Sequence, residues 1–260
     1  MASGLLPIAI GEATKSIAVI QQLKKRYKFS VKWGEKTSTD DKMGSIISST
    51  SIRPSLQNIN KNIKKFIGEI KQIPPKFSAI KVNGKRAYML ARNNEDFLLD
   101  ARSVFVESLK IHKYIDKDHC SFECICSKGT YIRALGRDLG SVMNCFGHLY
   151  QLRRTHIGKF STKCAILLDL SEKLIHSSAI LKNILPIEKV LESLPFINLT
   201  KKQENAIRNG QKICLDDLNE DDKNKKSLLF NSNDSLMICK NENRLICFFK
   251  IENNFVKPTR

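Results

Sequence analysis

The stretch Gly129-Thr130-Tyr131-Ile132-Arg133-Ala134-Leu135-Gly136-Arg137-Asp138-Leu139-Gly140 joins two segments of different periodicity. Ahead of it, residues 120–126 predict a mostly buried strand that enters a glycine turn, with one face formed by Cys120, Phe122, Cys124 and Cys126. After the turn, apolar residues recur at the spacing of one helical face, at Ile132, Leu135, Leu139 and Val142. The stretch is therefore expected to form a strand, a turn and a helix.

Arg133 falls in the first turn of this helix, shortly after Thr130, which is able to cap it. A cation at that end opposes the helix dipole, which favours carboxylates there. One interpretation is an arginine that only faces solvent. The other is an arginine placed to meet an anion, either a carboxylate or a phosphate, because binding groups are commonly held at strand-turn-helix junctions.

Length and composition describe a chain with a real hydrophobic core. Its 260 residues, of which 42% are hydrophobic, suit one large domain or an average one plus a small one. No apolar run approaches the roughly 20 residues that cross a bilayer, and the first residues lack a signal pattern. The eight cysteines form no CxxC pair. We therefore expect reduced core thiols in a cytoplasmic protein, and no metal site.

The formal net charge of +18 indicates a polyanionic partner, either nucleic acid or an anionic membrane. A lysine-, asparagine- and isoleucine-rich composition, as an AT-rich genome encodes, would also raise the charge. A membrane-surface protein is disfavoured because no predicted helix combines a lysine face with a large aromatic one. Nucleic acid is the favoured partner.

Several other segments have a clear periodicity. Residues 26–33 alternate as a strand, with one face formed by Tyr27, Phe29, Val31 and Trp33. Residues 56–70 predict an amphipathic helix that a double proline ends. Residues 5–10 are strand-like, and residues 103–114 predict a strand that pairs with residues 120–126. Cations interleave with an aromatic ring around a predicted tight turn, as on RNA-binding surfaces or a solvated hairpin, at Lys81, Lys85, Arg86, Tyr88 and Arg92.

The chain changes character near residues 181–186. Short helices are expected at residues 186–191 and 200–208, and residues 216–227 read as an exposed loop. Three short strands are then expected, at residues 228–230, 236–239 and 245–251. The sequence thus predicts two domains, 1–184 and a small β-rich domain at 185–260.

Four blocks of this chain together resemble one family. Residues 72–88, which begin Gln72-Ile73-Pro74-Pro75, resemble a signature block of the bacterial tRNA pseudouridine-55 synthases, the TruB family. Residues 129–133 and 152–155 look like two further blocks, and residues 4–15 like another. The blocks occur in the family's order and reach residue 160, whereas the C-terminal segment is more loosely similar to the family's small PUA-like domain.

The resemblance implies an α+β pseudouridine synthase fold, a mixed β-sheet with flanking helices, plus a small β-rich PUA-like domain. It implies an isomerase that acts on uridine 55 in the T arm of tRNA, as a monomer with neither cofactor nor metal. Family members cleave the glycosidic bond of a flipped-out uridine, rotate the base and rejoin it through carbon 5. Flipping is physically required because the reacting atoms are inaccessible in a base stack.

The resemblance also assigns roles to residues. Tyr27 would stack on the target base and assist proton removal, Arg133 would pair with the catalytic aspartate, and Leu152 would pack in the uridine pocket. Tyr27 and Leu152 have a plainer alternative as core residues. The remaining residues expected to bind substrate are Lys81, Lys85, Arg86, Tyr88, Arg153 and Arg154. Arg153 and Arg154 are adjacent on an extended segment and should point to opposite faces, one toward RNA and one toward the site.

One departure from the family concerns the nucleophile. The catalytic aspartate of the family sits in a block Gly-x-Leu-Asp-Pro-[Leu/Met]-Ala-[Ser/Thr]-Gly, whereas this chain begins Met1-Ala2-Ser3-Gly4, so that aspartate would lie two residues before Met1. Asp40 and Asp41 belong to another block and are poor substitutes. Two explanations stay open: a start assigned at an internal methionine, or a non-catalytic protein that binds or folds tRNA.

Overall fold

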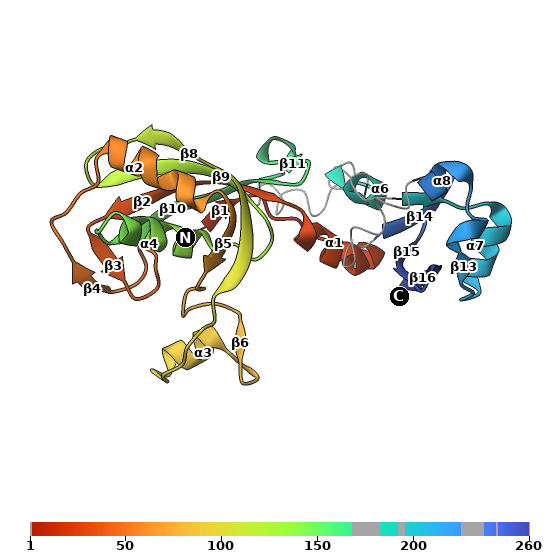
Figure 1. Ribbon diagram of the computed structural model, residues 1–260, viewed down its shortest axis with the longest axis horizontal. Helices are drawn as coiled ribbons and strands as arrows, with labels where there is room; N and C mark the ends of the chain where they lie inside the picture. Colours follow the sequence, from red (N-terminus) through yellow and green to blue (C-terminus); the bar gives the residue numbers. More distant parts are fainter. Residues whose placement is uncertain (1, 168–182, 192–195, 225–236, 243, 260) are drawn as a thin grey trace. The chain divides into compact units, whose positions relative to one another are not determined.

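The computed structural model describes residues 2–167, 183–191, 196–224, 237–242 and 244–259 (Figure 1). The chain forms two compact units. The first holds Met1–Ile8 and Ile20–Leu167, and the second holds Ala9–Val19 and Leu168–Arg260. The predicted division into residues 1–184 and 185–260 did not anticipate the early segment Ala9–Val19 in the second unit. Part of the predicted boundary region, residues 168–182, lies outside the described residues.

A mixed sheet is the framework of the first unit, with strand order β1-β10-β2-β9-β8-β5 and β11 paired to β10. β1 runs parallel to β10, and the other neighbouring pairs of described strands in this sheet are antiparallel. This confirms the mixed sheet that the family resemblance implied. The strands are β1 (Ala2–Gly4), β2 (Lys25–Trp33), β5 (Gly68–Gln72), β8 (Arg102–Tyr114), β9 (His119–Cys126), β10 (Gly147–Ile157) and β11 (Phe160–Ser161).

Two helices, α2 (Leu56–Ile63) and α4 (Ile132–Val142), pack on the same face of this sheet. The alternation of β2 directs Phe29, Val31 and Trp33 into the core between sheet and helices, where each is almost fully buried. Their partners there include the buried thiols of β9 and the apolar stripe of α4. The strand-turn-helix junction predicted at residues 120–142 is therefore the centre of the core.

Small residues let α4 lie close to β10. A Cβ atom added at Gly140 would come within 3.0 Å of three backbone atoms of residues 145–147. One added at Gly136 would meet only the Val31 side chain, at 3.3 Å. Side chains larger than hydrogen at position 140 would therefore push the helix away from the sheet.

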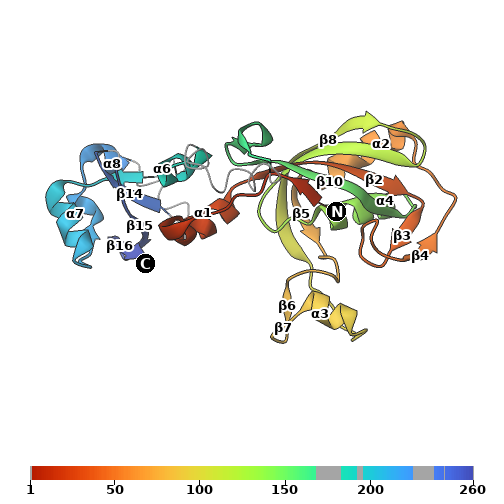
Figure 2. The same ribbon diagram turned by 180° about the vertical axis from the view of Figure 1, so that it is seen from behind.

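Two hairpins are added to the first unit. β3 (Glu35–Thr37) pairs with β4 (Ile46–Ser49), and β6 (Lys81–Val82) pairs with β7 (Lys85–Arg86). The second hairpin turns at Asn83-Gly84, both with positive φ, as the sequence Asn-Gly predicts. It continues into α3 (Ala87–Arg92), and both views show hairpin and helix extending away from the sheet (Figures 1 and 2).

The second unit contains a five-stranded sheet of order β12-β14-β15-β16-β13. Val19, near the start of α1 (Ile17–Gln22), is buried in this unit against Leu191 and Ile238. Among the described residues, no helix is long and apolar enough to cross a membrane. The remaining elements here are η1 (Gly11–Ser16), α6 (Ile187–Leu191), β12 (Phe196–Asn198), α7 (Lys201–Arg208), β13 (Ile213–Cys214), α8 (Glu220–Asn224), β14 (Met237–Asn241), β15 (Arg244–Glu252) and β16 (Phe255–Thr259).

Three local predictions were wrong. Residues 5–10 form no strand and leave Leu6, Ile8 and Ile10 exposed; the strand lies earlier, at β1. The helix expected over residues 56–70 ends in a 3-10 turn, and β5 begins at Gly68, whose φ of +95° breaks the helix. The loop expected over residues 216–227 contains α8. The strand predicted at residues 228–230 lies outside the described residues.

Candidate active site

The N-terminus of α4 is held by a side chain from a distant strand. The Tyr131 backbone N–H donates to Gln72 Oε1 at 2.8 Å, at the end of β5. Thr130, expected as the cap, instead donates its hydroxyl to the Ser127 carbonyl at 3.1 Å, so the prediction of a Thr130 cap was wrong. The first turn of α4 is thus tied to the start of the segment that leads to the β6–β7 hairpin.

Arg133 points from this turn into a cluster of oxygen atoms. Its Nη1 donates to the Thr39 carbonyl at 3.0 Å and lies 3.4 Å from Asp41 Oδ2, and its Nη2 donates to the Phe77 carbonyl at 2.8 Å. The side chain is mostly buried, with 21% of its surface exposed. Arg133 therefore meets a carboxylate, one of the two anions expected for it, and that carboxylate is Asp41.

The turn that carries Asp41 is built onto the edge of β10. Lys42 N–H donates to the Leu149 carbonyl at 2.9 Å, and Leu149 N–H donates to the Asp40 carbonyl at 3.0 Å. The Asp41 carboxylate is fixed locally, because its Oδ1 accepts from Thr39 Oγ1 at 2.8 Å and from Met43 N–H at 3.0 Å. Its Oδ2 is left to face Arg133.

Arg137 lies one helical turn after Arg133 and binds the same two backbone segments. Its Nη1 donates to Asp40 Oδ2 at 2.8 Å, and its Nη2 to the Ile73 carbonyl at 2.7 Å. Its Nε donates to Asp138 Oδ1 at 2.8 Å. Burial raises the pKa of the Asp40 carboxyl, and the Arg137 guanidinium opposes that rise.

Tyr27, Leu152 and Arg154 share the helix-covered face of the sheet. Leu152 is opposite Phe29 and Arg154 is opposite Tyr27 in the β10–β2 register, and both Tyr27 and Leu152 are partly buried against the core. Burial raises the pKa of the Tyr27 phenol, and Arg154 opposes that rise. Arg154 Nε also donates to the Leu5 carbonyl at 2.8 Å, which ties the chain after β1 to this strand.

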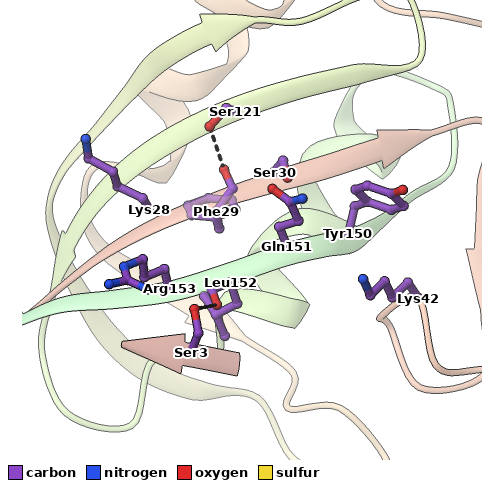
Figure 3. Close-up of a pocket in the computed structure, with 10 residues that line it drawn as sticks. All are labelled: Ser3, Lys28, Phe29, Ser30, Lys42, Ser121, Tyr150, Gln151, Leu152 and Arg153. Carbon is purple, nitrogen blue, oxygen red and sulfur yellow. Dashed lines mark hydrogen bonds between the residues drawn. The ribbon is translucent and has the colours of Figure 1, made fainter. Parts of the chain in front are cut away.

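Arg153 lies on the other face, as the alternation predicts. It is opposite the exposed Lys28 in the register, and among the described residues neither side chain has an ion-pair partner. The two cations line an open hollow of about 310 Å³ on that face (Figure 3), together with Ser3, Phe29, Ser30, Lys42, Ser121, Tyr150, Gln151 and Leu152. The sheet thus separates this basic hollow from Tyr27 and Arg133.

The cations predicted around the β6–β7 hairpin differ in how free they are. Lys81 is exposed, and Lys85 has only a loose contact of 3.8 Å with Glu95. Arg86 instead donates to the Ala79 carbonyl at 2.5 Å and so also holds the hairpin. Tyr88 is half-buried, with the Arg92 guanidinium 5.4 Å from the centre of its ring. Among the described residues, no group of three or more possible ligands could hold a metal ion.

The fold defines the class of the protein. The chain aligns over its whole length with the protein in the crystal structure of a Cbf5-Nop10-Gar1 complex, covering 72% of it with a TM-score of 0.72 at 20% identity. It aligns over its whole length with a chain of the archaeal box H/ACA sRNP Nop10-Cbf5 complex too, covering 73% of it with a TM-score of 0.67 at 19% identity. The fold is therefore that of the pseudouridine synthases.

Sequence comparison then gives the family. Residues 1–132 match the N-terminal domain of the TruB family pseudouridylate synthases, and residues 133–192 match the tRNA pseudouridylate synthase B C-terminal domain. A tRNA pseudouridine synthase B of Ehrlichia ruminantium is 38% identical over the whole of this chain and 86% of its own length. One of a Caulobacter species is 40% identical over 83% of this chain and 69% of its own. The chain belongs to the TruB family, as the sequence motifs predicted.

Sequence reasoning did not select Gln72, Asp41, Asp40 or Arg137. The two aspartates were named only as poor substitutes for a nucleophile, not as partners of arginines. The available signal was the spacing of Arg133 and Arg137, four residues apart and so on one helical face. Two cations at that spacing predict nearby anions, but the aspartates are more than 90 residues away along the chain.

Proposed function

We propose that this chain is a tRNA pseudouridine synthase that isomerises uridine 55 in the T arm of tRNA to pseudouridine. Family membership carries the reaction and the substrate. The structural observation that carries the site is that the fold places Arg133 in a buried oxygen cluster, next to the edge of the strand that bears Leu152. A flipped uridine needs an apolar wall, an aromatic ring and a held carboxylate.

Tyr27 and Leu152 supply the apolar part of this site. Both side chains lie on the helix-covered face, and both are only partly buried, so they retain surface that a base can contact. An aromatic ring offers a stacking surface to any base, and a leucine side chain excludes water beside it. The raised pKa of Tyr27 keeps its phenol protonated near neutral pH, so that the hydroxyl is a hydrogen-bond donor toward Arg154's surroundings or the substrate.

The position of the missing carboxylate follows from the sheet. The family's aspartate precedes Ala2 by three positions, about 10 Å along an extended chain. Ala2 is opposite Leu152, and three residues back along β10 is Leu149, the residue that binds the Asp40–Lys42 turn. A chain that continues β1 along this edge brings its aspartate beside Asp41 and Arg133.

Arg133 has donors to spare for that aspartate. The printed contacts use both hydrogens of Nη1 and one of Nη2, and among the described residues Nε and the second hydrogen of Nη2 have no partner. These two N–H groups lie on the same side of the guanidinium plane's edge and match the two oxygens of a carboxylate. We infer that this free side of Arg133 holds the nucleophile.

The β6–β7 hairpin and α3 are the proposed contact with the T arm. Lys81 and Lys85 are exposed there, and Arg92 lies over the ring of Tyr88, as on surfaces that bind backbone phosphate and bases. Arg153 and Lys28, on the other face of the sheet, form a second basic surface that we assign to the RNA backbone. Such contacts make the affinity fall with salt.

A second function, tRNA binding without catalysis, is favoured by one observation. The described site holds the arginine and its surroundings, but the family's nucleophile position falls two residues before Met1. Covalent catalysis by a carboxylate is not replaced by positioning alone. The two functions therefore differ in a single residue and are separable by adding it.

Three proteins test the proposal with a T-arm hairpin as substrate: the 260-residue chain, the chain extended by a family segment that ends in Gly-x-Leu-Asp-Pro, and the extended chain with Arg133→Ala. We expect all three to bind the hairpin, and only the extended chain to form pseudouridine at position 55. Product from the 260-residue chain would contradict the missing-nucleophile argument and direct attention to Asp40 and Asp41. Full activity of the extended Arg133→Ala variant would contradict the role of Arg133.

A further inference from the structure

α4 carries a second arginine that repeats the contacts of the first. Arg133 and Arg137 each bind one residue group of the 39–41 turn and one carbonyl of residues 73–77. The two arginines therefore form two parallel ties between α4, the turn on the edge of β10 and the segment that leads to the hairpin. Arg137 is the tie farther from the uridine pocket residues Tyr27 and Leu152 along α4.

Arg137 is bound on every side of its guanidinium. Its Nε, Nη1 and Nη2 donate to Asp138, Asp40 and the Ile73 carbonyl, all within 2.8 Å. Only 20% of the Arg137 side chain and 11% of the Asp40 side chain are exposed. Arg137 is therefore poorly placed to bind an RNA phosphate itself, and its contacts act on the protein.

Asp40 gives this pair control of the turn. Its backbone has a φ of +58°, a conformation that residues other than glycine seldom adopt. Its carboxylate is nearly buried, so that without Arg137 it would be a buried charge with no counter-ion, and removing one partner of such a pair is strongly destabilising. The turn would then have to shift or Asp40 take up a proton.

Every group that holds the Arg133 guanidinium belongs to the two segments that Arg137 fixes. Thr39 and Asp41 flank Asp40 in the turn, and Phe77 follows Ile73 in the other segment. We propose that Arg137 and Asp40 are a positioning pair, which sets the orientation of Arg133 toward the nucleophilic carboxylate. The proposal rests on the function proposed above.

The first test measures coupling and does not need activity. In the 260-residue chain, Arg133→Gln, Arg137→Gln and the double variant are unfolded thermally, followed by the fluorescence of Trp33, the sole tryptophan, which is fully buried in the first unit. Two arginines that share the turn should show non-additive losses, whereas independent arginines add. Additive losses would overturn the positioning pair whether or not the protein is a synthase.

The second test uses the extended chain and separates positioning from stability. Single-turnover rates and hairpin affinities are compared for Arg137→Gln, Arg137→Lys and Asp40→Asn. A misplaced Arg133 should slow the reaction on the order of 10- to 100-fold with affinity unchanged. Lysine should restore part of the rate, because it can pair with Asp40 but cannot also reach the Ile73 carbonyl.

Arg53→Gln is the matched control. Arg53 is also a partly buried arginine, paired with Asp118 and with the Thr50 carbonyl, but it touches neither the turn nor α4. Its loss should lower stability and leave the rate of the folded protein unchanged. Arg137→Gln with the rate of Arg53→Gln would overturn the proposal. An extended parent that forms no pseudouridine would sink the proposed function instead, while the coupling measured in the first test still decides on the pair.

Discussion

Gly140 and Gly136, on the same face of α4, allow a sharp test of how the helix is seated. In an open helix, glycine to alanine gains about 1 kcal/mol. At position 140 the new methyl group would lie 2.6 Å from Gly147 N and 2.8 Å from Phe146 C, which are backbone atoms that move only with β10. Overpacking of this kind costs about 1 to 3 kcal/mol. We therefore expect Gly140→Ala to destabilise the first unit by about 1 to 2 kcal/mol net.

Gly136→Ala is the control in the same helix. Its methyl group would meet Val31 Cγ2 at 3.3 Å, a contact that a small side-chain movement relieves. The helix propensity gain should then dominate, so this variant should be neutral or more stable by up to about 1 kcal/mol.

Thermal unfolding followed by Trp33 fluorescence measures both variants. Trp33 lies in the core of the first unit, so its signal reports that unit and not the second one. For a domain of this size, 1 to 2 kcal/mol corresponds to a melting-temperature decrease on the order of 2 to 8 °C. Equal melting temperatures for the two alanine variants, or a rise for Gly140→Ala, would refute the close approach of α4 and β10 as the reason for glycine at position 140.

Three further predictions concern RNA binding, catalysis and pH. Lys85→Ala and Arg86→Ala should each weaken tRNA affinity by roughly 0.5 to 1.5 kcal/mol and lower the salt dependence in a titration, and an affinity that salt does not change would rule out a phosphate-facing hairpin. Tyr27→Phe in the extended chain should keep hairpin affinity but slow pseudouridine formation by about 100-fold if its hydroxyl helps move a proton, whereas an unchanged rate leaves Tyr27 only a stacking role. Burial lowers the pKa of His148, whose Nδ1 lies 3.1 Å from the Glu35 carbonyl, so the unfolded chain binds the extra proton first and stability should fall as pH drops below about 6.5. His148→Gln should flatten that pH dependence in urea unfolding, and an unchanged slope would exclude His148 as its source.

Local periodicity predicted the centre of the first unit well. The alternation of residues 26–33 and 120–126 and the stripe of α4 describe burial on a sheet face and a helix face, which neighbouring residues encode directly. The same reasoning failed for residues 5–10, because an apolar run carries no information on whether a partner strand is available. It failed at Gly68 because one glycine with positive φ turned the end of a predicted helix into a strand.

The site was only partly accessible to the sequence. The position of Arg133 at the start of a helix indicated an anion, and the family motifs supplied Tyr27 and Leu152. The partner Asp41 could not be found from periodicity, since the contact depends on the pairing of a short turn with the edge of β10. Contacts of this kind are decided by tertiary structure, which no local pattern in the sequence records.

The burial of Val19 in the second unit has a consequence for how this protein can be divided. Val19 fills a place against Leu191 and Ile238, although some 150 residues of the first unit separate them in sequence. A C-terminal fragment that starts after residue 167 would lack this side chain and expose two leucine-type surfaces, at a cost of about 1.5 to 3 kcal/mol. Gene fusions that exchange the C-terminal unit between relatives would therefore have to carry two separate stretches of coding sequence, so the two units are expected to be inherited together.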